Sequence, residues 1–209
     1  MRFNKGLVAA ALLASTSAFA GLLDEGFNDV STLAGKGWVQ NNLSTAGGTT
    51  GWFQGNSGVF PAAAGAADSY IGANFENAPF GGAISNWLMS PSLSFSGPVT
   101  LNFALRLLGD SFLDTVEVYY NALGTTNVGD FALVDSYSST SDTGWMQESL
   151  SIGGAGANVG RFAFRYVVAD TSLDGNYIGI DSVSVVPEPI SLALVAMALT
   201  GLAVTRRRA

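Results

Sequence analysis

The side chains that could carry chemistry in this chain of 209 residues are almost all carboxylates. The sequence has 16 Asp and Glu residues but no histidine and no cysteine, so it lacks the commonest general base, the commonest zinc ligand and any thiol nucleophile. Two carboxylates suffice for glycoside cleavage, and Glu117 and Glu148 lie in strand-like segments where they could face each other. Any acidic β protein offers such pairs. We therefore expect both residues to be structural and the chain not to be an enzyme.

A second candidate chemistry is the binding of calcium. Ca²⁺ prefers clustered carboxylate and carbonyl oxygens, and acids from the two ends of a chain can cluster where its first and last strands pair. Glu25 and Asp181, with Asp24, Asp29 and Asp68, are therefore candidate metal ligands. No spacing matches an EF-hand loop, so the alternative is that these acids are solvated surface charges. A structural calcium ion is the only cofactor that the sequence suggests.

The four tryptophans are the remaining candidates, because exposed aromatic rings can stack on sugars whereas buried rings fill cores. Each of them lies beside a turn or at the start of a strand-like segment. Trp87 has apolar neighbours that are typical of a core residue. Trp52 lies in the stretch 51–56 with glycine and asparagine, so it is the tryptophan expected to be exposed. It is the one candidate ligand-binding residue.

The charge of the middle of the chain argues against nucleic acid as a partner. Of the nine basic residues, Arg2, Lys5 and three terminal arginines lie near the chain ends, and of the 16 acids only Glu188 does. Residues 21–186 therefore carry 15 acids and 4 bases, a net charge of −11. Such a surface repels nucleic acid and anionic polymers and attracts cations.

The elements that would position these residues are strands. Apolar and polar residues alternate with a period of two over 99–107, 116–121, 161–168 and 178–185, and more weakly over 69–73, 84–89, 131–137 and 145–152. Clusters of Gly, Asn, Ser, Thr and Asp separate these stretches and are typical of turns. Between residues 21 and 186 no stretch has a convincing helical period. The pattern predicts an all-β fold, a two-sheet antiparallel jelly-roll sandwich.

The N-terminal residues 1–20 predict a signal peptide. A basic start is followed by an apolar stretch over 6–13, which we expect to be helical, and then by small residues that include Ala18 and Ala20. Cleavage after Ala20 would leave Gly21 as the first residue of the mature chain. The sequence therefore predicts an exported protein.

The C-terminal residues 187–209 predict a membrane-associated tail. The tail contains a short proline motif, an uncharged stretch over 190–205 and a basic end, and its motif residues are Pro187, Glu188, Pro189, Arg206, Arg207 and Arg208. At about 1.5 Å per residue the uncharged stretch covers roughly 24 Å, so a transmembrane helix can just span the bilayer if the arginines snorkel. Positive charge is retained on the cytoplasmic side, so the residues before Pro187 should lie outside.

In this order of elements, residues 186–209 resemble a PEP-CTERM sorting signal. In that family the signal is recognised by exosortase, a membrane transpeptidase of Gram-negative bacteria that produce exopolysaccharide. The resemblance implies an exosortase-type partner and a protein that is anchored in the membrane, or placed at the cell surface or outside the cell after C-terminal processing. A plain membrane anchor is the alternative.

The middle of the chain shows a second resemblance, which rests on short sequence motifs. They are Asp24-Glu25-Gly26-Phe27, Gly37-Trp38, and the stretches 52–56, 68–71, 86–91, 99–103, 162–166 and 177–183. In this order they resemble choice-of-anchor J domains, which are similar to cleaved-adhesin and MAM jelly rolls and precede interchangeable anchoring tails. The resemblance covers nearly all of residues 21–186. Where the family often has two acids before the valine of the last strand, this chain has Asp181-Ser182, which weakens a metal site that needs both.

Three functions are consistent with these observations. The leading hypothesis is a non-enzymatic protein of the cell surface or the exopolysaccharide matrix, for which an extracellular polysaccharide is the expected partner. The alternative is a lectin-like carbohydrate-binding module, which would need exposed coplanar aromatic rings flanked by Asn, Asp or Gln. A jelly-roll enzyme that cleaves glycans is the third hypothesis, and it would need two convergent carboxylates.

Overall fold

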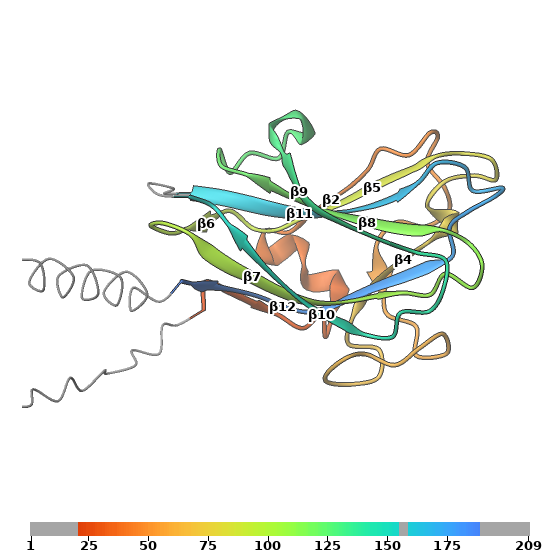
Figure 1. The fold of residues 1–209 in the computed structure, drawn as a ribbon, viewed down its shortest axis with the longest axis horizontal. Helices are drawn as coiled ribbons and strands as arrows, with labels where there is room; N and C mark the ends of the chain where they lie inside the picture. Colours follow the sequence, from red (N-terminus) through yellow and green to blue (C-terminus); the bar gives the residue numbers. More distant parts are fainter. Residues whose placement is uncertain (1–20, 155–158, 189–209) are drawn as a thin grey trace, which may run out of the picture.

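Two antiparallel sheets packed face to face make up this computed structural model, which describes residues 21–154 and 159–188 (Figure 1). Sheet A has the order β10 (Met146–Ile152), β7 (Val99–Leu107), β12 (Tyr177–Pro187), β4 (Ile71–Asn74) and β3 (Phe53–Gln54), and β1 (Leu23–Glu25) also pairs with β12. Sheet B has the order β2 (Val39–Asn42), β5 (Ile84–Met89), β11 (Val159–Val168), β8 (Asp114–Asn121) and β9 (Ala132–Ser139), and β6 (Leu93–Ser94) also pairs with β11. The predicted two-sheet antiparallel sandwich is confirmed.

The helical elements of the described ranges are four short 3₁₀ turns. They are η1 (Val30–Thr32), η2 (Ala34–Lys36), η3 (Phe75–Asn77) and η4 (Val128–Asp130). All eight strands expected from the alternation are present, with boundaries shifted by a few residues. The strands that the alternation missed, β1, β2, β3 and β6, contain two to four residues each, which is too short for a period of two to be visible.

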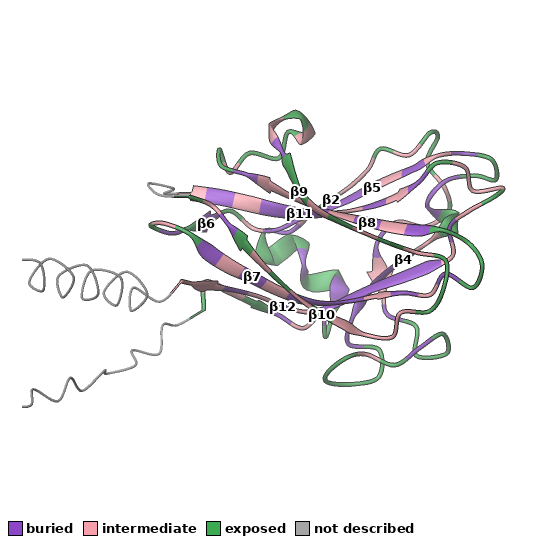
Figure 2. Ribbon diagram, in the orientation of Figure 1, coloured by how far each residue is buried: buried purple, intermediate pink, exposed green. Residues whose placement is uncertain are grey.

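The core lies between the sheets and follows the alternation of the long strands. On β7 the buried residues Leu101, Phe103 and Leu105 face those of β11, and the rings of Phe103 and Phe164 meet edge to face with centroids 5.0 Å apart. Leu33, which lies between η1 and η2, packs in the same core. Figure 2 shows buried residues along the central strands, whereas most of the connecting loops are exposed.

The last strand extends slightly past the expected domain boundary. Pro187 is the final residue of β12 and pairs with Val99, and the Glu188 N–H donates to the Pro98 carbonyl at 3.3 Å. The Ser151 hydroxyl also donates to the Glu188 carboxylate at 2.6 Å. Pro187 therefore closes the strand from inside it, as proline does at strand ends, and does not stop the strand one residue earlier.

No helix within residues 21–154 and 159–188 is long and apolar enough to cross a membrane. The expected signal peptide, with Ala18 and Ala20, and the expected transmembrane stretch 190–205 lie outside the described residues, as do Pro189, Arg206, Arg207 and Arg208. Both expectations stay predictions.

A second aromatic cluster covers the outer face of sheet A. Phe60 of the loop over 55–69 is buried there against Tyr70 and Tyr177, and its ring stacks on Tyr70 with centroids 5.1 Å apart. The cluster rests on Gly179 of β12, where a Cβ would lie 2.9 Å from atoms of both Phe60 and Trp145. The absence of a side chain at Gly179 thus makes room for the aromatic rings.

We predict that Gly179→Ala lowers the free energy of unfolding by about 1–3 kcal/mol, because the added methyl group must displace packed rings. Urea unfolding followed by tryptophan fluorescence measures this. Gly35→Ala is the matched control, since nothing lies within 4 Å of a Cβ at that position and its stability should be unchanged or slightly raised. Equal stabilities of the two variants would contradict the role of Gly179.

Candidate functional site

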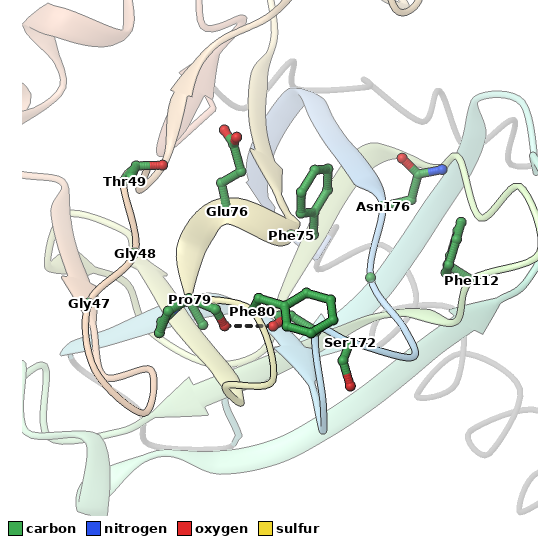
Figure 3. A pocket seen from close by; sticks show the side chains of 13 residues that line it. Gly47, Gly48, Thr49, Phe75, Glu76, Pro79, Phe80, Phe112, Ser172 and Asn176 are labelled. Atoms are coloured by element: carbon green, nitrogen blue, oxygen red, sulfur yellow. Dashed lines mark hydrogen bonds between the residues drawn. The ribbon is translucent and has the colours of Figure 1, made fainter.

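A groove of about 730 Å³ opens at the end of the sandwich where β12 begins, and we call it the loop-end groove (Figure 3). Four connections form it, between β2 and β3, β4 and β5, β7 and β8, and β11 and β12. Its lining residues are Gly47, Gly48, Thr49, Phe75, Glu76, Ala78, Pro79, Phe80, Phe112, Thr171, Ser172, Gly175 and Asn176. The groove lies at the opposite end of β12 from Pro187, and the connections that line it are on the right in Figure 1.

Three phenylalanine side chains of the groove are exposed. Phe80 is 88% exposed, and Phe75 and Phe112 are 46% and 45% exposed. Figure 3 shows Phe75 and Phe80 on the β4–β5 connection and Phe112 on the β7–β8 connection. Exposed apolar side chains that gather at one place are typical of binding surfaces, because isolated domains gain nothing from presenting them to water.

Polar residues hold the walls of the groove in place. The Thr171 hydroxyl donates to the Pro79 carbonyl at 2.7 Å, which ties the β11–β12 connection to the β4–β5 connection next to Phe80. Gly48 packs so closely on η3 that a Cβ would lie 1.9 Å from the Glu76 carbonyl oxygen. The Gly48 N–H donates to the Asn77 carbonyl at 3.1 Å, so the β2–β3 wall has a fixed position.

The buried carboxylate of Asp114 joins the fourth connection, between β7 and β8, to the β11–β12 connection. It accepts hydrogen bonds from the Gly109 N–H at 3.0 Å, the Asn176 N–H at 2.8 Å and the Tyr166 hydroxyl at 2.7 Å. Burial raises the pKa of Asp114, and the hydrogen bonds from Asn176, Tyr166 and Gly109 partly oppose this shift. Asp114 therefore sets the position of Asn176, and of the turn that leads from Gly109 to Phe112.

Three of the five expected calcium ligands have other partners. Glu25 forms an ion pair with Lys36 at 2.8 Å, and Asp181 is buried and accepts from the Ala64 N–H at 3.0 Å. Asp29 caps η1 through the Ser31 N–H. Asp24 and Asp68 are exposed. Within the two described ranges no three acidic side chains lie close enough to hold a metal ion, so the structure does not bring this set together, and a calcium ion stays a prediction.

The hypothesis that Glu117 and Glu148 face each other is wrong. Glu117 alternates on β8 with the buried residues Val116 and Val118, so its side chain points away from sheet A, where it pairs with Arg165 at 3.1 Å. Glu148 belongs to sheet A, on β10. The two carboxylates therefore lie on different sheets with the core between them, and they cannot act on one glycosidic bond.

The expectation that Trp52 is exposed is also wrong. Its side chain is only 5% exposed and packs in the main core, because the glycine-rich stretch around it folds over the end of the sandwich. Trp87 is buried, as expected. The exposed rings of the site are phenylalanines instead. The signal that could have identified Phe80 is its place between Pro79 and two glycines, which is typical of a protruding turn.

The fold and its groove define this chain as a jelly-roll sandwich with a groove of exposed aromatic rings at one end. No protein-family model and no curated protein matches the sequence. Among solved structures, the K1 cleaved adhesin domain of Lys-gingipain from Porphyromonas gingivalis W83 is similar, with a TM-score of 0.59 and 17% identity over 80% of this chain and 98% of that chain. The K2 cleaved adhesin domain of Lys-gingipain has a TM-score of 0.58 and 19% identity over 79% and 98% of the two chains.

A carbohydrate-binding structure is also similar. TmCBM61, solved in complex with β-1,4-galactotriose, has a TM-score of 0.50 and 11% identity, with 81% of this chain and 99% of that chain covered. These similarities show a jelly-roll fold like that of cleaved adhesin domains, as the short sequence motifs predicted.

We predict that Asp114→Ala destabilises the domain by about 3 kcal/mol or more, because two buried donors and one partly buried donor lose their acceptor. Chemical unfolding measures this, with Asp24→Ala, which removes an exposed acid, as the control.

The pH dependence of the free energy of unfolding gives a second test of Asp114. The raised pKa means that the folded protein binds the Asp114 proton more tightly than the unfolded chain does, so wild-type stability should fall relative to Asp114→Asn as the pH rises above the ordinary aspartate range. Parallel pH curves for these two proteins would contradict this prediction.

Proposed function

We propose that this protein is an exported, non-enzymatic surface module that binds an extracellular glycan in the loop-end groove. The observation that carries the proposal is the set of three exposed phenylalanine rings in a groove that also presents Glu76, Ser172 and Asn176. The groove thus supplies exposed aromatic rings and, in Asn176, one of the flanking amides that a lectin-like module would need.

The chemistry of this lining suits a sugar. A pyranose ring has apolar C–H faces and a rim of hydroxyl groups, so it needs flat apolar surfaces with hydrogen-bonding groups beside them. The ring of Phe80 is almost fully exposed, so covering it removes a large apolar area from water. The side chains of Ser172 and Asn176 can exchange hydrogen bonds with hydroxyl groups. Both requirements are met within one groove.

The position of the groove supports display at a surface. The described chain ends at Glu188, beyond Pro187, and the proposed sorting tail follows directly. The groove lies at the other end of β12, so a domain held by its C-terminus presents the groove away from the point of attachment. The structural similarity to TmCBM61, which was solved with a bound oligosaccharide, also supports a glycan as the ligand.

The lining of the groove supports binding without cleavage. Glu76 is the one carboxylate among the described residues that line it, whereas glycosidases use a pair of carboxylates. Polymer length should therefore stay constant during incubation with the protein.

We further propose that the tail 187–209 is a PEP-CTERM-type signal and that an exosortase-type enzyme processes it. We also propose that the domain belongs to the choice-of-anchor J type. The order of the tail's three parts supports the sorting signal, and the order of the short motifs within residues 24–183 supports the domain type.

We predict that Phe80→Ala weakens glycan binding about tenfold or more, because it removes a ring that a ligand would cover. Affinity electrophoresis in gels with the producing organism's exopolysaccharide and with common polysaccharides measures the retention. Leu123→Ala is the matched control, since Leu123 is 67% exposed but follows the far end of β8. If both variants are retained like the wild type, the groove is not the binding site.

We predict that a chain ending at Glu188 is secreted in soluble, folded form, because all hydrogen bonds of β12 remain while the apolar stretch and the arginines are removed. Cell fractionation beside the full chain measures this, and mass spectrometry of the product should find Gly21 at its N-terminus. Aggregation, or membrane retention equal to that of the full chain, would contradict a separable sorting tail.

A further inference from the structure

A second hollow of about 440 Å³ adjoins the loop-end groove, and we call it the side hollow. It is lined by Thr50, Phe53, Asn56, Val59, Asn74, Phe75, Leu108, Asn176 and Tyr177. Phe75 and Asn176 line both hollows. The two therefore lie side by side at these residues, and we call the pair the path across the end of the sandwich.

The side hollow repeats the chemistry of the groove. Its apolar surface comes from Phe53 and Phe75, and its polar groups are the side chains of Asn56, Asn74 and Thr50. Because Phe75 is 46% exposed and stands where the hollows meet, a ligand that occupies both must pass over its ring. A single terminal sugar would occupy only one hollow, whereas an internal stretch of a polymer can occupy both.

The distribution of basic side chains bears on the charge of the polymer. No basic residue lines either hollow. The four bases of the described ranges contact other groups: Lys36 contacts Glu25, Arg106 contacts Asp142, Arg161 contacts the Ser90 carbonyl, and Arg165 contacts Glu117.

Acidic residues, by contrast, surround the path. Glu76 lines the groove, and Asp110, Asp170 and Asp174 lie on the connections that form it. A polymer with carboxylate or sulfate groups would be repelled from this end of the domain. An uncharged chain avoids this repulsion.

We infer that the loop-end groove and the side hollow together bind an internal stretch of an uncharged polysaccharide, with Phe75 as the central stacking surface. The inference rests on the proposed function. It adds that the ligand is uncharged and that more than one of its sugar units contacts the protein. Affinity increases with chain length until both hollows are filled, and then stays constant.

Isothermal titration with uncharged β-1,4-linked galactose and glucose oligosaccharides, from disaccharide to hexasaccharide, tests the length dependence. We expect an increase in affinity of about tenfold or more along at least one series, since about 1.4 kcal/mol from an additional ring contact corresponds to that factor. Val59→Trp fills the side hollow from an exposed position and should remove this increase while short oligosaccharides still bind. An unchanged thermal midpoint confirms that the variant is folded.

The charge is tested by comparing dextran with carboxymethyl-dextran, and each neutral polymer with polyuronates, in gels of low ionic strength. Weaker retention by the charged member supports the inference, whereas stronger retention overturns it and leaves the proposed function standing. Affinity that is independent of chain length, or a Val59→Trp variant with unchanged length dependence, also overturns the inference alone. If no polymer is retained, the organism's own exopolysaccharide included, the proposed function fails as well.

Discussion

The buried carboxylate of Asp114 is the interaction on which the loop end of this sandwich depends. A carboxylate without water is unfavourable unless donors surround it, and here Gly109, Tyr166 and Asn176 supply them from three separate parts of the chain. The same bonds that compensate for the buried charge fix the relative positions of the connections. The irregular connections that line the groove are thereby hydrogen-bonded to Asp114 at the start of β8, which holds them in place.

Asp181 acts in a similar way on the outer face of sheet A. Its carboxylate accepts from the Ala64 N–H, while the indole N–H of Trp145 donates to the Pro61 carbonyl at 2.9 Å. Together with the aromatic cluster above Gly179, these bonds hold the loop 55–69 against the sheet. Asn56 and Val59 of that loop line the side hollow. Both hollows thus have walls that buried acidic side chains keep in place.

The strands could be predicted from the sequence because their faces differ in burial. β7 and β11 contact the core with every second residue over nine or ten positions, so their pattern is unmistakable, whereas β3 has two residues and no readable pattern. The site was less predictable. Which acids are buried depends on contacts between segments that are distant in sequence, such as Asp114 with Asn176. Such contacts cannot be inferred from composition. A sugar-binding ring was expected among the tryptophans, but Trp38, Trp52 and Trp87 are buried. The exposed rings are the three phenylalanines of the loop-end groove.

The course of β12 has a mechanical consequence. This strand runs from Tyr177, beside the groove, to Pro187, where the proposed tail begins, and β7 accompanies it along most of that length. A pull between a bound ligand and a C-terminal attachment would act parallel to the strand. Its hydrogen bonds to β7 and β4 would then be loaded in shear, so that many must break together, and not peeled open one after another. In this geometry the path of force through the domain is the one along which a sheet resists extension best.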